Sequence, residues 1–402
     1  MRSTIATVCG IGVAIGIAPS AALGAVQPLT ITYRGTAAIG SAAVDQNAAP
    51  FTVAELSGIT FRSGNAAAGE YVAVMDGSNK LVRLSVGLHP NGAVNSLSVI
   101  AGVTLIATND NEGVAFTTPG RNSVFVAEEG IPIVSEYSLT NGAILQALNT
   151  PGVFANRRAN NGFESMARRT SNGELWTANE EALTVDGSIS SQAAGTTVRL
   201  LRYSPGTTPV AAEQYAYVVD SWHGGSISGA RSGLCDIVAL PSGTLLSLER
   251  SLAASLNGLF RSRIYEVTAA ARASATNVAG MPGLTGQTYT PVSKRLLWES
   301  FSIGQNLEGL CLGPKLSNGN RSLLGVVDDG DIFSNNTLVA FELAGTITCP
   351  ADFNEDEAVT VQDIFDFLAA WFAGNASADF NGAGGVSVQD IFDFLAAWFG
   401  GC

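Results

Sequence analysis

The chain has 402 residues, of which 46% are hydrophobic and only 14% charged, with a formal net charge of -13 and a pI near 4.6. The acidic balance argues against a nucleic-acid-binding protein, because phosphates need a basic surface, and it is typical of a cation-binding or extracellular protein. The 45 glycines and many short apolar runs indicate β structure around one large core, with room for one small further domain.

Residues 1–25 have the parts of a secretory signal peptide. Arg2 supplies a positive charge, an apolar run extends from Ile5 to Ala18, and small residues near Gly24 offer a cleavage site. The alternative is a membrane anchor, but the run is shorter than the roughly 20 residues that a spanning helix needs. We therefore predict an exported protein, secreted or at the cell surface, with no transmembrane helix.

Residues 26–348 contain five loosely repeated units, which begin near residues 55, 111, 163, 235 and 306. Each unit has a small-residue or acidic head, an apolar strand, a turn rich in Gly, Asn or Ser, and a second apolar strand that ends in acid. A third strand follows in every unit and a fourth in four of them. This pattern predicts an all-β fold, a β-propeller of five to six blades. The spare strand after Pro28 is expected to complete the last blade.

The heads and tails of these units carry carboxylates. Because the first two strands of a blade are antiparallel, the head of one and the tail of the next lie at the same face. Five blades would then form an acid ring around one mouth of the central channel, and a hard cation, Ca²⁺ above all, would neutralise it. The alternative is that each acid caps loop amides or pairs with an arginine. Besides Glu164 and Glu308, the predicted ring comprises Asp76, Glu112, Glu128, Glu180, Asp236, Glu249 and Asp328.

Three segments resemble a known family. They are NGFESMARRTSNGELWTANEE with Glu164, SGLCDIVALPSGTLLSLERS with Glu249 and Arg250, and NLEGLCLGPKLSNGNRSLLGVVDDGD with Glu308 and Asp328. They are similar to motifs of the secreted proteins described as having esterase-like activity of phytase, and the likeness covers roughly residues 50 to 345. The resemblance implies a propeller hydrolase that uses calcium to cleave a phosphate or other ester of an anionic small molecule.

Three residues are the predicted catalytic groups. Glu164 or Glu308 would ligate the metal or act as general base, and Arg250 would hold a phosphate oxygen. The chain has few basic residues near the predicted ring, which departs from the propeller phytases. Two other functions stay open: a non-catalytic propeller that binds a ligand or polymer, and a calcium-dependent lactonase-like hydrolase. A Ser-His-Asp triad using His223 is a further alternative, although neither HExxH nor GxSxG occurs.

Residues 349–402 contain a tandem repeat, ADFNEDEAVTVQDIFDFLAAWFAG followed by ADFNGAGGVSVQDIFDFLAAWFGG. Each copy places oxygen donors at the ligand positions of a calcium loop that runs into a helix. The predicted ligands are Asp352, Asn354, Asp356, Thr360 and Asp363 in the first loop, and Asp379, Asn381, Ser387 and Asp390 in the second.

This duplicated loop and helix resembles the type I dockerin, an EF-hand-like module. The resemblance implies calcium binding and docking on a cohesin-like or cell-surface anchoring partner. Glu357 replaces the usual glycine of the first loop and Ala383 a carboxylate of the second, so both sites are expected to be weakened. Both helices are apolar almost all round, which predicts an exposed patch of Phe and Trp for a partner. The alternative is that they bury these side chains against each other or against the propeller.

Export makes disulfides possible, and four cysteines remain once Cys9 has left with the signal peptide. Cys349 and Cys402 bracket the C-terminal segment and are predicted to pair. Cys235 and Cys311 are then predicted to pair with each other across adjacent inner strands. Two free buried cysteines are the alternative for the second pair.

Overall fold

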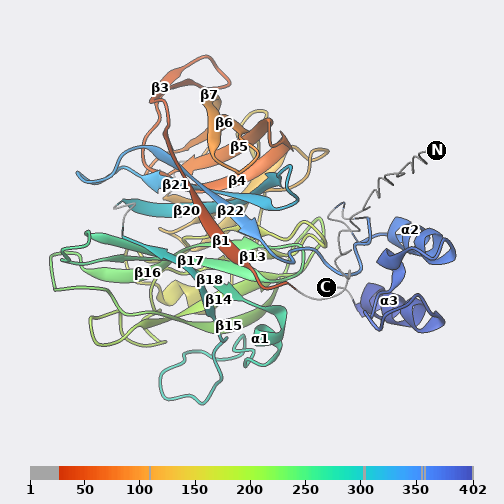
Figure 1. Ribbon diagram of the computed structural model, residues 1–402. Helices are drawn as coiled ribbons and strands as arrows, with labels where there is room; N and C mark the ends of the chain where they lie inside the picture. The colour runs from red at the N-terminus through yellow and green to blue at the C-terminus, as the bar shows by residue number, and fades with distance from the viewer. Residues whose placement is uncertain (1–26, 108–109, 302–304, 355, 357–358, 401–402) are drawn as a thin grey trace, which may run out of the picture.

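The computed structural model describes residues 27–107, 110–301, 305–354, 356 and 359–400. They form five four-stranded antiparallel sheets around a central channel, followed by two C-terminal helices (Figure 1). The predicted β-propeller is thus confirmed, and the described part of the chain has five blades. The predicted signal peptide lies outside the described residues and stays a prediction.

Each blade is numbered in the order in which its inner strand occurs along the chain. Blade one consists of β4 (Leu56–Asn65), β5 (Ala68–Met75), β6 (Lys80–Leu88) and β7 (Val94–Thr104). Blade two consists of β8 (Asn111–Phe116), β9 (Ser123–Glu128), β10 (Ile133–Ser138) and β11 (Ile144–Ala147). Blade three consists of β12 (Ala167–Arg168), β13 (Leu175–Ala178), β14 (Thr196–Tyr203) and β15 (Ala211–Val219).

Blade four consists of β16 (Arg231–Ala239), β17 (Leu245–Leu252), β18 (Phe260–Val267) and β19 (Arg295–Ser300). Blade five consists of β20 (Asn306–Lys315), β21 (Arg321–Asp328), β22 (Thr337–Ala344) and β1 (Thr30–Ala38). A small hairpin, β2 (Ala42–Val44) and β3 (Pro50–Thr52), and a short helix, α1 (Ala269–Ala273), lie in the connections.

Blade five is completed by the N-terminal strand, as predicted. β1 pairs antiparallel with β22, so that Thr30 lies opposite Ala344 and Tyr33 opposite Phe341. Arg34 of β1 also forms an ion pair with Glu342 of β22. Because β1 comes from one end of the propeller sequence and β22 from the other, this pairing closes the ring and holds a terminus that would otherwise fray.

The core lies between neighbouring blades rather than in one central mass. Inner strands such as β8, NEGVAF, are buried along their whole length, because both of their faces pack on other blades. Side chains of outer strands such as β7 are mostly exposed or half-buried, and only two adjacent residues of β7 are buried. A continuous apolar run in the sequence therefore marks a strand near the channel.

The predicted disulfide between Cys235 and Cys311 is wrong, because both cysteines are free and buried. Successive residues of a strand point to opposite faces. On β20, Leu310 packs with Cys235 between blades four and five, whereas Cys311 packs with Tyr71 between blades five and one. The two sulfur atoms therefore belong to different inter-blade layers. Cys349 is buried, but its predicted partner Cys402 lies outside the described residues, so that pairing stays a prediction.

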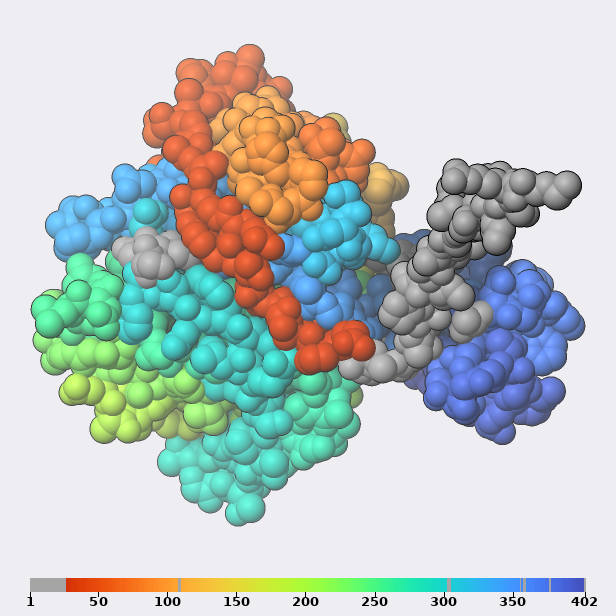
Figure 2. Space-filling model, in the orientation of Figure 1, coloured from red at the N-terminus to blue at the C-terminus, as the bar shows by residue number. Residues whose placement is uncertain are grey.

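The C-terminal helices, α2 (Val361–Phe372) and α3 (Val388–Gly400), form a lobe beside the propeller (Figure 2). Phe367 and Phe394 stack at its centre with ring centroids 4.2 Å apart. The indole nitrogens of Trp371 and Trp398 each donate to the other repeat, to Ser387 O and Thr360 O. The tryptophans are thus half-buried within the lobe. None of the described helices is long and apolar enough to span a membrane.

Each of the two helices keeps one apolar side exposed. Residues four or seven positions apart on a helix lie on the same side. Val361, Phe365 and Phe372 have these spacings in α2, and Val388, Phe392 and Phe399 have them in α3. The exposed fractions of the four phenylalanines are 61%, 79%, 62% and 77% for Phe365, Phe372, Phe392 and Phe399. Each helix therefore exposes apolar side chains, as predicted, and these are phenylalanine and valine rather than tryptophan.

Candidate metal and active site at the channel mouth

The inner strands of all five blades run in the same direction along the channel. Their heads lie opposite the tails of the second strands: Asn111 pairs with Glu128, Phe163 with Asn179 and Asn306 with Asp328. Most of the acids predicted from heads and tails therefore meet at one end of the channel. We call this end the acidic mouth, and the opposite end the far mouth.

Glycines next to the head acids let the blades approach closely here. A Cβ on Gly113 would collide with the backbone at Ser165 and Met166 of blade three, and one on Gly309 with Ser57 O of blade one. Only glycine allows this approach. The sequence Glu-Gly at the head of a blade thus narrows the channel and brings carboxylates of different blades together.

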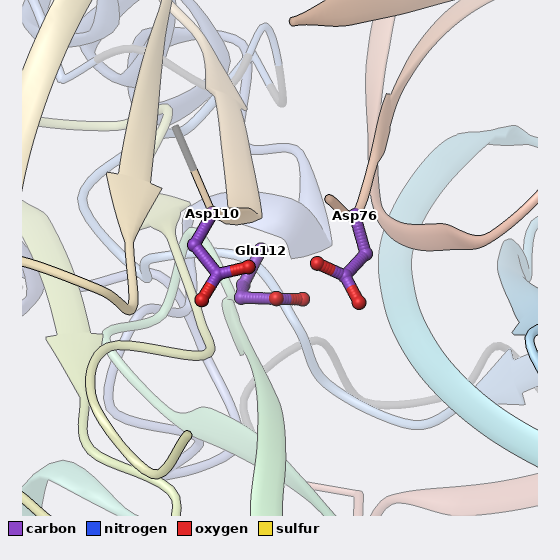
Figure 3. A group of neighbouring side chains, drawn as sticks. All are labelled: Asp76, Asp110 and Glu112. Carbon is purple, nitrogen blue, oxygen red and sulfur yellow. The ribbon is translucent and has the colours of Figure 1, made fainter. Parts of the chain in front are cut away.

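The first carboxylate cluster comprises Asp76, Asp110 and Glu112, from blades one and two. One oxygen of each lies within 4.8 Å of one oxygen of the others. Figure 3 shows the carboxylates of Asp110 and Glu112 close together, with that of Asp76 facing them. Burial, and then the charge of Asp110, raises the pKa of Asp76 to about 6. Burial and the neighbouring Asp76 raise the pKa of Glu112 well above its usual range.

The second carboxylate cluster comprises Glu129, Glu164 and Glu180, which are all buried and again lie within 4.8 Å of one another. They follow β9, precede β12 and follow β13, respectively. Burial raises the pKa of Glu129 to about 7. Burial, together with the charges of Glu112, Glu180 and Glu129, raises the pKa of Glu164 well above its usual range. Such convergence of acids is costly unless a cation is bound.

Two buried amide oxygens at the same mouth also lack a partner. Asn111 donates through Nδ2 to Ser78 O at 3.0 Å, and Asn306 donates to Glu308 and Asp328 at 3.0 and 2.9 Å. These bonds orient the amides, and within the described part of the chain nothing donates to Oδ1 of either. Oδ1 of Asp76 is also buried and has no hydrogen-bond partner among the described residues. A buried acceptor without a partner costs about 1–3 kcal/mol, and oxygen atoms of this kind are the ligands that Ca²⁺ prefers.

Arg250 connects the second cluster to blade five. Its Nη2 donates to Glu308 Oε1 at 2.7 Å and to Glu180 Oε1 at 3.2 Å. Burial raises the pKa of Glu308 to about 8, although the nearby charge of Arg250 opposes this. The structure therefore brings together the three residues predicted to be catalytic, Glu164, Glu308 and Arg250, through Glu180.

A cavity of about 340 Å³ opens at the acidic mouth. Its polar lining includes Glu55, Asp76, Arg231, Arg250, Asn306 and Asp328. Arg231 lies 3.7 Å from Glu180, and more than a third of its side chain is exposed. Two arginines thus line a cavity beside the carboxylates, although the sequence predicted few basic residues there. This arrangement can bind an anionic group next to a cation.

Two of the predicted ring acids have structural partners elsewhere. Glu249 accepts from Tyr217 Oη at 2.7 Å and Asp220 N at 3.0 Å, and forms an ion pair with Lys294. Asp236 accepts from the backbone N–H groups of Leu310 and Ile237 at 2.7 and 2.8 Å. Because Leu310 belongs to β20, Asp236 ties blade four to blade five.

Sequence reasoning missed several residues of the mouth. It did not single out Asp110, Asn111 or Arg231, and it chose Glu128 where the adjacent Glu129 joins the second cluster. Asp110 directly precedes the acidic head of blade two. A search one or two residues before each head would have found it. For Arg231, which begins β16 five residues before Asp236, the sequence carried no comparable signal.

The imidazole of His223 does not form a catalytic triad with the described residues. Its Nδ1 lies 2.8 Å from Ser251 Oγ and its Nε2 3.2 Å from Gly258 O. Among the described residues, no carboxylate bonds to the ring, and Ser251 is fully buried. The pair fastens a loop to β17.

The two C-terminal loops fold around one acid each. Asp363 accepts from Phe353 N at 2.9 Å and Thr360 N at 2.7 Å, and it completes the capping box of α2. Asp390 accepts from Asn381 N at 3.1 Å and Ser387 N at 2.7 Å.

Near the start of each loop, further predicted ligands bond to the backbone. Asp352 and Asn354 accept from Asp356 N at 3.0 Å, and Asp379 accepts from Gly384 N at 2.9 Å. In both loops the acid at the last ligand position accepts backbone N–H groups of the described residues, and calcium binding there stays a prediction.

Comparison with known proteins identifies the propeller sequence. A family model described as "Phytase-like: Esterase-like activity of phytase" matches residues 52–331. No protein of curated function matches the chain.

Solved structures resemble the chain only weakly. The calcium structure of a Trichoderma reesei carbohydrate-active enzyme of family AA12 is 12% identical, with 80% of this chain and 97% of that chain covered and a TM-score of 0.35. Myxococcus xanthus glutaminyl cyclase is 10% identical, with 79% and 98% covered and a TM-score of 0.36. The tail fibre of Staphylococcus aureus phage P68 is 11% identical, with 78% and 52% covered and a TM-score of 0.37.

Proposed function

The chain belongs to the phytase-like family, whose description is esterase-like activity of phytase, and we propose that it is an ester hydrolase that acts at its acidic mouth. One observation carries the proposal: Arg231, Arg250 and Asp76 of the first cluster line one cavity of about 340 Å³, and Arg250 also donates to Glu180 of the second cluster. Phosphate or other esters of anionic small molecules are the proposed substrates.

Calcium is the proposed cofactor. The donor atoms that converge at the mouth are carboxylate and amide oxygens, and one oxygen each of Asp76, Asn111 and Asn306 has no hydrogen-bond partner among the described residues. Within the described residues neither cluster contains a histidine or cysteine, which softer metals would favour. When bound, calcium would supply positive charge that polarises an ester oxygen and makes a nearby water more acidic.

The protein's own groups divide the remaining work. Arg231 and Arg250 would orient the anionic part of the substrate, because guanidinium groups match phosphate and carboxylate oxygens. Glu164 and its cluster would hold the cation. Glu308, whose pKa burial raises to about 8, would exchange a proton near neutral pH. The hydrogen bond that Glu308 accepts from Arg250 would also hold the Arg250 side chain in place.

The first test is an assay of the chain from residue 26 onward. Phosphate monoesters, phytate, carboxyl esters and lactones would be offered with calcium and with a chelator. We expect calcium-dependent turnover of at least one class. Turnover of lactones alone would establish the lactonase-like alternative. Absence of turnover, with calcium still raising the melting temperature, would instead support a non-catalytic binding propeller.

The second test replaces one carboxylate of the second cluster. Glu164→Gln keeps the shape and removes the charge, and we expect turnover to fall by about 10²-fold or more, as for other catalytic groups. Glu299→Gln is the matched control, because Glu299 lies on β19, the outer strand of blade four, where it forms an ion pair with Arg261 of β18. Equal activity of the two variants would refute a role for the second cluster.

The C-terminal lobe is proposed to be a calcium-dependent anchor of the dockerin type. The duplicated loops and the exposed phenylalanine face support this assignment. The partner would be a cohesin-like or other cell-surface protein. The test is binding to a panel of cohesin domains with calcium and with a chelator. Phe365→Ser combined with Phe392→Ser should abolish binding, whereas Glu299→Gln should not. Retained binding by the double variant would exclude this face.

Export is proposed from residues 1–25 and would make the protein secreted or surface-attached. Expression with and without these residues would test it. Recovery of the protein outside the cell only when they are present is the expected result.

A further inference from the structure

We infer that the far mouth of the channel is a second binding site, which takes a small amphipathic anion with an apolar body and a carboxylate or phosphate head. The site is independent of the proposed hydrolysis, since it lies at the other end of the channel and shares no lining residue with the cavity of the acidic mouth.

The far mouth contains a cavity of about 470 Å³, larger than the one among the acids. Its walls come from the inner strands of all five blades. A volume of this order suits a small organic molecule. The charges are reversed relative to the acidic mouth, because three arginines from different blades line it: Arg62, Arg168 and Arg321.

Of the three arginines, Arg168 gives the strongest indication of a bound anion. Its guanidinium is half-buried, yet within the described part of the chain no acceptor bonds to its side chain. Burial lowers the pKa of Arg168, which reflects the cost of a cation without a partner. Arginines that serve the fold are paired here: the next residue, Arg169, donates to Pro241 O at 2.8 Å and lies 3.5 Å from Glu174.

The other two arginines add positive charge and have partners of their own. Arg62 forms an ion pair with Glu70 at 2.6 Å and lies over the ring of Phe116, but its buried Nε has no acceptor among the described residues. Arg321 donates through Nε to Gly313 O at 2.9 Å. Thr118 and Thr170, whose side chains carry hydroxyl groups, also line the cavity. Guanidinium and hydroxyl donors together are the usual surroundings of a carboxylate or phosphate.

The rest of the cavity is apolar. Its wall includes Phe61, Val114, Phe116, Met166, Ile237 and Leu310. A bare inorganic anion would leave this surface uncovered, whereas an alkyl or aryl group would bury it at about 25 cal/mol per Å². The lining therefore selects a molecule that is charged at one end only.

One acid, Asp356 of the C-terminal segment, also lines the cavity. It is a predicted calcium ligand of the first loop. A bound anion would be repelled by this carboxylate, so its removal should favour the ligand.

The experiment is a calorimetric titration of the chain from residue 26 onward, in chelator, with three probes. Octanoate has both features, inorganic phosphate lacks the apolar body, and octyl glucoside lacks the charge. Octyl phosphate, in a parallel titration, distinguishes the two head groups. We expect saturable one-to-one binding of octanoate or octyl phosphate that is at least tenfold tighter than binding of the other two probes. Equal binding of octyl glucoside would overturn the role of the arginines, and equal binding of phosphate would overturn the role of the apolar wall.

Variants locate the site. Arg168→Met should weaken octanoate binding at least tenfold, and Arg168→Lys should weaken it less. Arg295→Met, on the outer strand of blade four, should change nothing, and Asp356→Asn should leave binding equal or tighter. Unchanged binding in Arg168→Met, or weaker binding in Asp356→Asn, would refute the assignment. The ligand is no ester and calcium is absent, so failure here leaves the proposed hydrolysis untouched.

Discussion

Two groups of buried acids in this propeller look alike in the sequence but have different partners. The Glu249 network consists of Glu249, Tyr217, Asp220, Arg263 and Lys294. In it the carboxylate of Glu249 receives a tyrosine hydroxyl, a backbone N–H and two cations. At the acidic mouth, the carboxylates of Glu129, Glu164 and Glu180 lie within 4.8 Å of one another, and among the described residues only Glu180 of the three has cationic partners, Arg250 and Arg231. The comparison teaches that the number of hydrogen-bond and cationic partners, rather than burial or position in the repeat, distinguishes the Glu249 network from the acids of the proposed site.

The largest expected effect is on the Glu249 network. Lys294→Met removes a cation that lies against a fully buried carboxylate. Breaking a buried pair from one side costs about 3–5 kcal/mol, so urea unfolding should show a loss of this size. Calcium should not restore it. A loss below 1 kcal/mol, or rescue by calcium, would place Glu249 in the same class as the mouth acids. Arg295→Met, on an exposed pair with Glu266, is the control.

The acidic mouth should show the opposite behaviour. Calcium at about 100 times its dissociation constant stabilises a folded protein by about 2.7 kcal/mol, and thermal unfolding would detect this. In Glu164→Gln the gain from calcium should shrink sharply. In chelator this variant should be at least as stable as the unchanged protein, because glutamine is neutral without taking up a proton, whereas burial and the neighbouring acids disfavour the charged form of Glu164. A strong loss of stability in chelator would mean that Glu164 is structural.

These contrasts also mark what the sequence alone could predict. The blades were predictable because strands, turns and repeats are local patterns, and even the closing strand β1 was identified by its isolation from any other unit. The position of heads and tails at the same end of the channel was also predictable, because the first two strands of each blade are antiparallel. Which acids have structural partners could not be predicted, because these partners lie far away in the sequence. Glu249 meets Tyr217 from 32 residues before and Lys294 from 45 residues after.

The pH dependence of stability should differ between the regions in a smaller way. The folded-state pKa of Glu308 is raised to about 8, so between about pH 5 and pH 7 the folded protein holds a proton that the unfolded chain has released. Stability in chelator should therefore fall as pH rises, by about 1.4 kcal/mol per pH unit for each such proton. Glu308→Gln should remove one such contribution from the slope, whereas Glu299→Gln should not. Equal slopes in all three proteins would contradict the raised pKa.

The smallest effect concerns the two free thiols. Burial raises the pKa of Cys235 to about 12 and that of Cys311 well above its usual range. Both therefore stay neutral, and a neutral thiol packs like a small apolar group and needs no partner. In the protein from residue 26 onward, a thiol reagent should label neither cysteine in the folded state and two thiols per chain after unfolding without reductant.

That thiol count sharpens the comparison, because it tests buried titratable groups that carry no charge. Two thiols after unfolding would fit free Cys235 and Cys311 together with the predicted Cys349–Cys402 pair. Four would contradict that pair, and none would contradict the separation of Cys235 and Cys311 into different inter-blade layers. Rapid labelling of the folded protein would show that these layers open. If the thiols are silent while the mouth acids respond to calcium and pH, then the convergence of many carboxylates on few cations, rather than burial, distinguishes the acidic mouth.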